Sequence, residues 1–598
     1  MRRIFAFLLV CLLVGAMLVP TVCAVLPADG RLVAAHTAIA ASVGQDTVGA
    51  AVLVIEGGGA AMAEGFGYAD LATGVLVTPD TVFEIGEISA LFVTLSVLRL
   101  IDEGVISLDD NVADCLSQDV VASLALQYPV TIRQLLAGQG GFGGRITDVF
   151  YEKKEHCFES LTEAVLAAVP EQVTKPGTVT SYSDFGIALL ALVVEWKTGK
   201  PFSLYVTDQF LAPLAMQDTQ LSLQLAVNAP ATGYTQGEDG AFYTDSNNGR
   251  RYAALAPATG AVTSLSDMQK LLLWLLSENA LSAASRAILK QTVASGMLTV
   301  GATPFTPLSN GVLALSGSTA CFGAALTLDL DAENAALVLV NTPVTALLSL
   351  PSALFGGVGL SLTLPQGDMA ELKPLRGTYL PMSADLSCFV GRLAAMDVGA
   401  LVRVKDDTLY FGDAMLVQIA RGVFADATAP EVPLLQFLLD EEGEPVALLT
   451  ADGAVYTPAP VFGTGLPARA ALGALFVLGA GVLLLALFGL FRWLTDLDRH
   501  GRREGVLSPL AGGFAALTVL FAGTQVLLAF KRGAMAISSA YFALRVLTLL
   551  AGIAAAVTLV LAFITTVFNR RTHRHVATAG IAFVLFFLLA IFFGLTVM

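Results

Sequence analysis

The chain has 598 residues, of which 55% are hydrophobic and only 14% are charged, and its formal net charge is −16. This composition excludes an ordinary soluble globular protein and favours a membrane protein, and the length predicts several domains. Residues 25–469 hold 21 Lys and Arg against 46 Asp and Glu, a net charge of −25, which excludes nucleic acid and anionic lipid headgroups as partners of that region.

The first residues of the chain have the pattern of a secretory signal peptide. Arg2 and Arg3 precede the apolar run 4–19, and small residues ending at Ala24 follow it. Such a segment is removed on export, so we expect a signal peptide over residues 1–24. An uncleaved membrane anchor is the alternative interpretation of the same pattern.

Residues 25–365 combine helical and strand patterns, which predicts an α+β domain. Strands are expected at 50–56 and 64–68, where two apolar runs flank a turn of three glycines. A helix is expected at 91–101, where leucine and isoleucine recur at helical spacing. Further helices are predicted at 185–196 and 268–276, and a strand pair at 323–330 and 335–341.

The next segment, residues 372–458, changes to short alternating strands with polar turns. Runs 401–404 and 408–411, for example, flank a pair of aspartates. This pattern predicts a separate small all-β domain. Residues 459–469 are rich in Pro and Gly and are expected to be a linker.

The C-terminal residues 470–598 are predicted to be a membrane domain. It contains four apolar segments of about 20 residues or more, the length that a membrane-spanning helix needs. The first and third connections are rich in arginine, so they are expected in the cytoplasm. The first span then runs from outside to inside, in agreement with export of the preceding region. The predicted spans are 470–491, 506–530, 546–568 and 576–598.

Few side chains of the exported region suit disulfides or metal sites. Its only histidines are His36 and His156, too few for the usual zinc site, so we expect no metal and no cofactor. The wide spacing of its cysteines favours buried thiols over a disulfide framework. These cysteines are Cys115, Cys157, Cys321 and Cys388.

A series of short motifs runs through residues 30–365. It includes 65–70 (GFGYAD), 78–86 (TPDTVFEIG), 108–112 (LDDNV), 131–136 (TIRQLL), 213–219 (PLAMQDT) and 264–268 (SLSDM). The series resembles the β-lactamase-related, penicillin-binding-protein-like serine hydrolases, which include class C β-lactamases, D-alanyl-D-alanine peptidases and related esterases. The resemblance implies an antiparallel sheet with flanking helices and a helical subdomain, with the active site between them. It also implies that the small β domain is similar to the lipocalin-like appendage of that family.

The first catalytic motif of that family is Ser-x-x-Lys, whose spacing places nucleophile and base on one helix face. The matching positions here are Glu87 and Ala90, so both groups are missing. Ser89 does not substitute for the nucleophile, because the residue three positions further on is Phe92. No Ser-x-x-Lys occurs anywhere in the chain.

The second and third motifs are also altered. The family's Tyr-x-Asn corresponds to Tyr182 and Asp184, where the tyrosine is kept and a carboxylate replaces the amide. The strand motif, a basic residue or histidine two positions before Gly, corresponds to Leu315 and Gly317. Losing a triad-type nucleophile lowers turnover by about 10⁶. Because the losses fall on chemical positions, the resemblance implies a kept fold and a discarded reaction.

These vestigial pocket positions leave several interpretations open. Glu87 is expected at a helix N-terminus, where the helix dipole favours a carboxylate without any further role. Alternatively, Glu87, Tyr182 and Asp184 form a pocket for a cation, an amine or a hydroxylated ligand. Two neighbouring carboxyl groups also serve as an acid–base pair where one pKa is raised.

We therefore expect a catalytically inactive, multi-pass protein of a bacterial cytoplasmic membrane, with a large extracytoplasmic region. That region is expected to bind a cell-wall or small-molecule ligand or to act as a scaffold at the cell envelope. Four spans are more than an anchor needs, which favours a membrane-protein partner. The alternative is an active serine-type hydrolase, such as a peptidase, an esterase or a β-lactamase, with a rearranged site.

Overall fold

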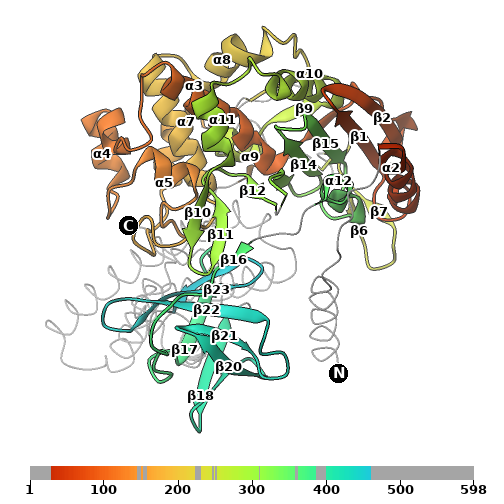
Figure 1. The fold of residues 1–598 in the computed structure, drawn as a ribbon. Coiled ribbons are helices and arrows are strands. Elements are labelled where there is room, and N and C mark those ends of the chain that lie inside the picture. The colour runs from red at the N-terminus through yellow and green to blue at the C-terminus, as the bar shows by residue number, and fades with distance from the viewer. Residues whose placement is uncertain are drawn as a thin grey trace, which may run out of the picture. The chain divides into compact units, whose positions relative to one another are not determined.

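A computed structural model describes residues 28–144, 150–151, 158–221, 230–244, 248–249, 252–308, 310–356, 361–384 and 399–459. These residues divide into two compact units, one up to Gly141 and from Tyr151 to Pro365, the other from Gln366 onwards with the residues around Phe142 (Figure 1). The predicted signal peptide, the four spans and all but the first residue of the predicted linker lie outside the described residues. Within the residues that are described, no helix combines the length and apolar character needed to cross a membrane.

The first unit is built on a seven-stranded antiparallel sheet in the order β12-β13-β14-β15-β1-β2-β3. The two predicted strand pairs are confirmed as β1–β2 and β14–β15, because apolar runs flank tight turns at both places. The strands are β1 (Gly49–Glu56), β2 (Gly59–Asp70), β3 (Val75–Leu76), β12 (Thr306–Pro307), β13 (Leu313–Ser318), β14 (Gly323–Asp329) and β15 (Asn334–Val340).

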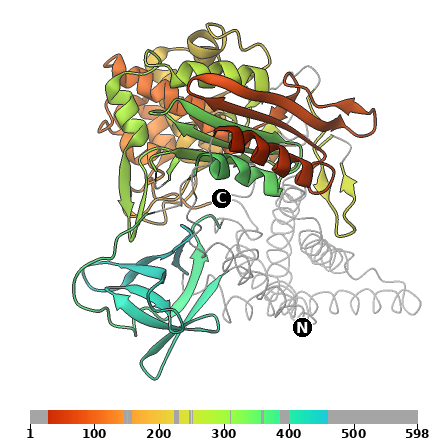
Figure 2. The same cartoon turned by 45° about the vertical axis from the view of Figure 1, so that its right-hand side comes forward.

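Both faces of this sheet are covered by helices. On one face, Val52 and Val54 of β1 share a buried cluster with residues of α2 (Ala28–Ser42) and α12 (Leu350–Phe355), and Figure 2 shows both helices against the sheet. The alternate residue Leu53 is also fully buried, and helix α10 (Leu265–Leu276) contacts β1, β2 and β15. Side chains alternate between the faces of a strand, so the continuous apolar run in β1 reflects a strand buried on both sides.

The helical part of the first unit surrounds α3 (Ala90–Asp102) and α7 (Asp184–Thr198), which contact each other. Both were predicted as helices, α3 from the helical spacing of its apolar residues, and α3 is apolar over most of its surface because all but its last turn is buried. Its other helices and turns are η1 (Gly86–Ser89), η2 (Val112–Cys115), α4 (Gln118–Leu124), α5 (Ile132–Leu136), α6 (Leu161–Ala167), α8 (Phe202–Val206), η4 (Thr207–Leu211), α9 (Ala256–Thr259), α11 (Ala283–Lys290) and η5 (Ala346–Ser349).

Short strand pairs complete the first unit. They are β4 (Val82–Glu84) with β9 (Val262–Ser264), β5 (Phe150–Tyr151) with β8 (Tyr252–Ala253), β6 (Thr235–Gln236) with β7 (Phe242–Tyr243), and the sheet β10 (Thr292–Ser295), β11 (Leu298–Gly301) and β16 (Ser361–Leu362). The β4–β9 pair matters for the site, because β4 leads directly into η1 and α3.

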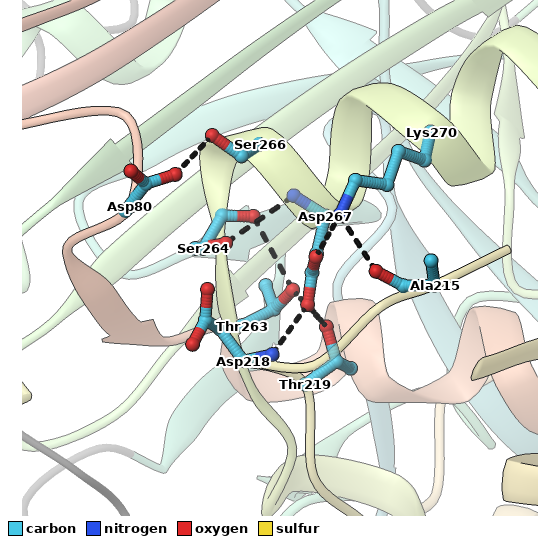
Figure 3. Close-up of polar contacts among 9 residues, drawn as sticks. All are labelled: Asp80, Ala215, Asp218, Thr219, Thr263, Ser264, Ser266, Asp267 and Lys270. Atoms are coloured by element: carbon cyan, nitrogen blue, oxygen red, sulfur yellow. Dashed lines mark hydrogen bonds and ion pairs between the residues drawn. The ribbon is translucent and has the colours of Figure 1, made fainter. Parts of the chain in front are cut away.

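A buried polar network holds the start of α10 (Figure 3). Asp267 is 1% exposed and accepts hydrogen bonds from Asp218 N (2.7 Å), Thr219 Oγ1 (2.9 Å) and Lys270 Nζ (2.8 Å). Ser264 caps the helix by accepting a bond from Asp267 N. Two of the sequence motifs therefore meet here, and their polar residues fix backbone segments to each other.

The second unit contains a closed antiparallel barrel of eight strands, which confirms the predicted small all-β domain. Its strands are β17 (Gly377–Pro381), β18 (Ala400–Lys405), β19 (Thr408–Phe411), β20 (Ala414–Ala420), β21 (Val423–Asp426), β22 (Pro433–Leu439), β23 (Pro445–Thr450) and β24 (Val455–Pro458). Closure follows from the pairing of β17 with both β18 and β24. The inward-facing side chains form a core that includes Tyr379, Phe424 and Phe437, whose rings meet edge to face.

The predicted cysteine chemistry is only partly visible in the described residues. Cys115 is a buried thiol in η2, as the spacing of the cysteines predicts, and Cys321 is also buried. Cys157 and Cys388 lie outside the described residues.

Candidate active site

Glu87, the position that corresponds to the family nucleophile, lies in η1, which contacts β13. Two glycines permit this contact. Gly86 has φ +52°, and a Cβ there would lie 2.3 Å from Ser318 N. A Cβ on Gly317 would lie 2.2 Å from Ile85 O and 2.7 Å from Glu87 N. Both glycines are therefore required for the backbone of η1 to lie directly against β13.

The Glu87 carboxylate is held by backbone N–H groups at this contact. Its Oε2 accepts a hydrogen bond of 2.7 Å from Ser318 N. Burial raises the pKa of Glu87, while hydrogen bonds from the N–H groups of Ser318 and of Glu87 itself act in the opposite direction. A backbone N–H group directed at an anionic group is one element of an oxyanion hole. Here a carboxylate of the protein itself accepts that hydrogen bond.

No general base accompanies Glu87 on α3. Ala90 is the first residue of that helix and is fully buried. Ser89 is also fully buried, and its Oγ donates to Gly86 O (2.5 Å) and accepts from Ala261 N (3.0 Å). Both bonds join backbone segments, so Ser89 acts as a structural residue, in agreement with the sequence analysis.

Tyr182 and Asp184 lie at the start of α7, where Ser183 caps the helix by accepting a bond from Gly186 N. The Tyr182 side chain is 41% exposed overall, but its hydroxyl is directed inwards and donates to Ala258 O at 3.4 Å. Burial, followed by the negative charges of Asp184 and Glu87, raises the pKa of Tyr182 well above its usual value. The hydroxyl therefore remains protonated at neutral pH.

Asp184 is the most strongly perturbed carboxyl group of the site. Burial, followed by the negative charge of Glu87, raises its pKa to about 7, and contact with the Tyr182 hydroxyl acts in the opposite direction. Its Oδ1 is buried and has no hydrogen-bond partner in the part of the chain that the structure describes. The structure thus brings together three of the predicted residues, Glu87, Tyr182 and Asp184, from η1 and α7.

The third motif contributes backbone rather than side-chain chemistry. Leu315 is 7% exposed and packs within the sheet, whereas Ser316 and Ser318 on the same strand are exposed. Gly317 supports η1. Sequence reasoning missed Ser318, whose N–H binds Glu87, because a motif describes side chains and this contribution comes from the backbone. Its only signal was its place directly after Gly317.

Chemically, the arrangement lacks a nucleophile paired with a base. It offers instead two interacting carboxyl groups and a protonated phenol. Among the described residues, no group of three or more His, Cys, Asp and Glu side chains is placed to hold a metal ion. Two such carboxyl groups share a proton, bind a cation or act as acid and base.

Comparisons with known proteins agree with this fold. The family model described as Beta-lactamase matches residues 32–349, more than half of the chain. Protein flp of Staphylococcus aureus (strain MW2) is 30% identical over 172 residues, 29% of this chain and 34% of that protein. Penicillin-binding protein 4 of Amycolatopsis lactamdurans is 33% identical over 147 residues, 25% of this chain and 38% of that protein. The chain thus spans little more than a third of these curated relatives.

A solved structure extends the similarity in fold. The crystal structure of SurE covers 72% of this chain and 98% of its own, with a TM-score of 0.53 and 20% sequence identity. At this identity the similarity concerns the fold alone.

Proposed function

Since this chain belongs to the β-lactamase family, we propose that it is a homologue of the serine hydrolases that has lost acyl transfer and binds a ligand instead. The observation that carries the proposal is the bond between Glu87 and Ser318 N. A carboxylate stands at the nucleophile position and occupies a backbone N–H group that would otherwise stabilise an acyl oxygen. An acyl substrate would have to displace a hydrogen-bonded anion before reacting.

The neighbouring positions support the same proposal. A methyl group at Ala90 replaces the lysine base, and Ser89 is committed to backbone bonds. Losing the nucleophile and the base together removes a catalytic unit that raises turnover by about 10⁶-fold. The motif residues around Asp267, by contrast, are joined by hydrogen bonds from Asp218 N, Thr219 Oγ1 and Lys270 Nζ, which is a structural role and not a catalytic one.

We further propose that the protein is anchored in the cytoplasmic membrane of a bacterium with the β-lactamase-related unit outside. The signal-like N-terminus, the four apolar segments and the arginine-rich connections support this topology. At the cell envelope the unit would bind a cell-wall or small-molecule ligand, or act as a scaffold for a membrane protein.

Covalent labelling tests the loss of acyl transfer. The full chain, kept in mild detergent because of its apolar C-terminal region, is incubated with a fluorescent penicillin and with a fluorophosphonate probe. We expect no label on the wild-type chain. Label at one site per chain would contradict the proposal, and mapping the modified residue would identify the nucleophile.

A restored site provides the matched control. The double variant Glu87→Ser/Ala90→Lys supplies nucleophile and amine, but the Asp184 carboxylate beside the new ammonium would keep it protonated and a poor base. The triple variant with Asp184→Asn removes that charge. We expect penicillin label on the triple variant and less on the double variant. Thermal unfolding of each variant confirms that the fold is kept.

A second candidate function rests on the pair Glu87 and Asp184. Because the pKa of Asp184 is about 7 and Glu87 lies nearby, the two carboxyl groups have the character of an acid–base pair. Hydrolysis of nitrocefin and p-nitrophenyl acetate by the wild-type chain, lost in Asp184→Asn, would favour this function. Equal rates for the two proteins, at the level of buffer, would exclude it.

A further inference from the structure

The two carboxyl groups of the site lack a positive partner. Among the described ion pairs, each joins a basic residue to a carboxylate elsewhere, and none includes Glu87 or Asp184. The charge that acts on Asp184 is that of Glu87, the neutral Tyr182 phenol acts through a hydrogen bond, and no cation is among these groups. Partly buried carboxylates are usually paired with a cation or metal, so this site is electrostatically incomplete.

Asp184 Oδ1 is the second sign of a missing partner. The atom is buried and has no hydrogen-bond partner in the described part of the chain. A buried acceptor left unpaired is unfavourable, and such atoms in native proteins usually mark a function or an absent ligand. The unpaired atom lies on the carboxyl group whose pKa the negative charge of Glu87 raises.

We propose that Glu87, Tyr182 and Asp184 form a subsite for the ammonium group of a primary-amine ligand, an inference that rests on the ligand-binding role proposed above. An ammonium group has three N–H donors and needs three acceptors. The site supplies Asp184 Oδ1, the second carboxylate oxygen of Glu87 and the Tyr182 hydroxyl oxygen, whose own hydrogen is donated to Ala258 O. The number of acceptors therefore matches the number of donors.

The chemistry of the site favours an amine over other ligands. Calcium takes six to eight oxygen ligands, more than two carboxyl groups and a phenol offer. An anion would be repelled by both carboxylates. A neutral hydroxylated ligand would leave the two negative charges uncompensated, whereas an ammonium ion neutralises one and hydrogen-bonds to both.

Binding of an amine should be linked to proton release. Without a bound amine, Asp184 is about half protonated near pH 7, because its pKa is about 7. An ammonium ion favours the ionised carboxylate, so binding expels this proton to the solvent. Affinity should then rise about tenfold from about pH 6 to about pH 8, while a simple alkylamine stays fully charged.

Isothermal titration calorimetry of the full chain in detergent tests the inference. The probe is n-butylamine, with n-butanol as the uncharged control of similar shape. Titrations in two buffers of different ionisation enthalpy count the protons released. We expect saturable binding of the amine alone, proton release, and at least tenfold weaker binding in the isosteric variant Asp184→Asn. Glu195→Gln, at the far end of α7, is the matched control and should bind as the wild-type chain does.

Several results would overturn the inference. They are the absence of saturable amine binding, equal binding of n-butanol, or an unchanged affinity in Asp184→Asn. None of these results bears on acyl transfer. Penicillin label on the wild-type chain would instead overturn the proposed function, so the two failures are distinguishable.

Discussion

Replacing Asp184 by asparagine should change how the stability of the β-lactamase-related unit depends on pH. In the folded chain the pKa of Asp184 is raised to about 7 from its ordinary value of 3.8, chiefly by burial. The folded state therefore holds a proton that the unfolded state releases as the pH rises above the ordinary value. The contribution of Asp184 to the unfolding free energy is therefore greatest below pH 3.8. It decreases as the pH rises to about 7, the pKa of Asp184 in the folded chain, and is constant above that pH.

The magnitude follows from the two pKa values. One pKa unit corresponds to about 1.4 kcal/mol, so the whole shift destabilises the ionised form by about 4 kcal/mol. Between about pH 5 and about pH 8 the part lost is roughly 2.5 kcal/mol. The amide of Asp184→Asn does not titrate. The difference in unfolding free energy between variant and wild type should therefore grow by that amount, in favour of the variant.

Urea unfolding of the full chain in detergent measures this difference. Trp196 and Trp274 report on the unit, and a Trp493→Phe background removes the third tryptophan of the chain. Asp239→Asn is the control. Hydrogen bonds from Tyr243 and Ala241 lower the pKa of Asp239, so its effect lies at acid pH and this variant should follow the wild type between about pH 5 and about pH 8. Parallel pH profiles for wild type and Asp184→Asn would refute the perturbed carboxyl group.

Three further substitutions test the framework. Asp267→Ala leaves Asp218 N unpaired in the network of Figure 3 and should destabilise the unit by about 2–4 kcal/mol in urea unfolding. Gly317→Ala places a Cβ 2.2 Å from Ile85 O and should lower the unfolding free energy by about 1–3 kcal/mol or more. Phe437→Ala empties part of the barrel core and should cost about 3–5 kcal/mol, measured by amide hydrogen exchange confined to barrel strands.

Periodicity predicted the main elements of the fold. Helix α3 was visible because leucine and isoleucine recur at helical spacing, and strand β1 because a short continuous apolar run ends at a glycine turn. The barrel was visible as a domain of short strands, but its closure was not. The pairing of β17 with β24 joins the two ends of the segment, and no local pattern encodes that contact.

The role of the shared motifs became clear only from contacts. Sequence comparison treats Asp80, Asp218 and Asp267 alike as motif residues. In the structure Asp80 accepts from Ser266 Oγ at 2.6 Å, and Asp267 joins the 213–219 segment to α10. These residues connect segments that are far apart in the chain, which explains why they are kept although the reaction motifs are altered.

The sequence named residues for the candidate site, but it did not predict their pKa values or the backbone hydrogen bond to Glu87. The motif positions named Glu87, Tyr182 and Asp184 together, and in the structure these groups interact electrostatically. Their pKa values depend on burial and on distances between η1 and α7, which no spacing rule supplies. The part of Ser318 also escaped prediction, because a backbone N–H carries no side-chain signature.

The central claim, that Glu87 ends acyl transfer by replacing the nucleophile and occupying a backbone N–H group of the site, is tested most directly by intact-protein mass spectrometry. The full chain is incubated with benzylpenicillin beside the triple variant Glu87→Ser/Ala90→Lys/Asp184→Asn. We expect an unchanged mass for the wild-type chain and one added penicilloyl group on the variant. One penicilloyl group on the wild-type chain would contradict the claim.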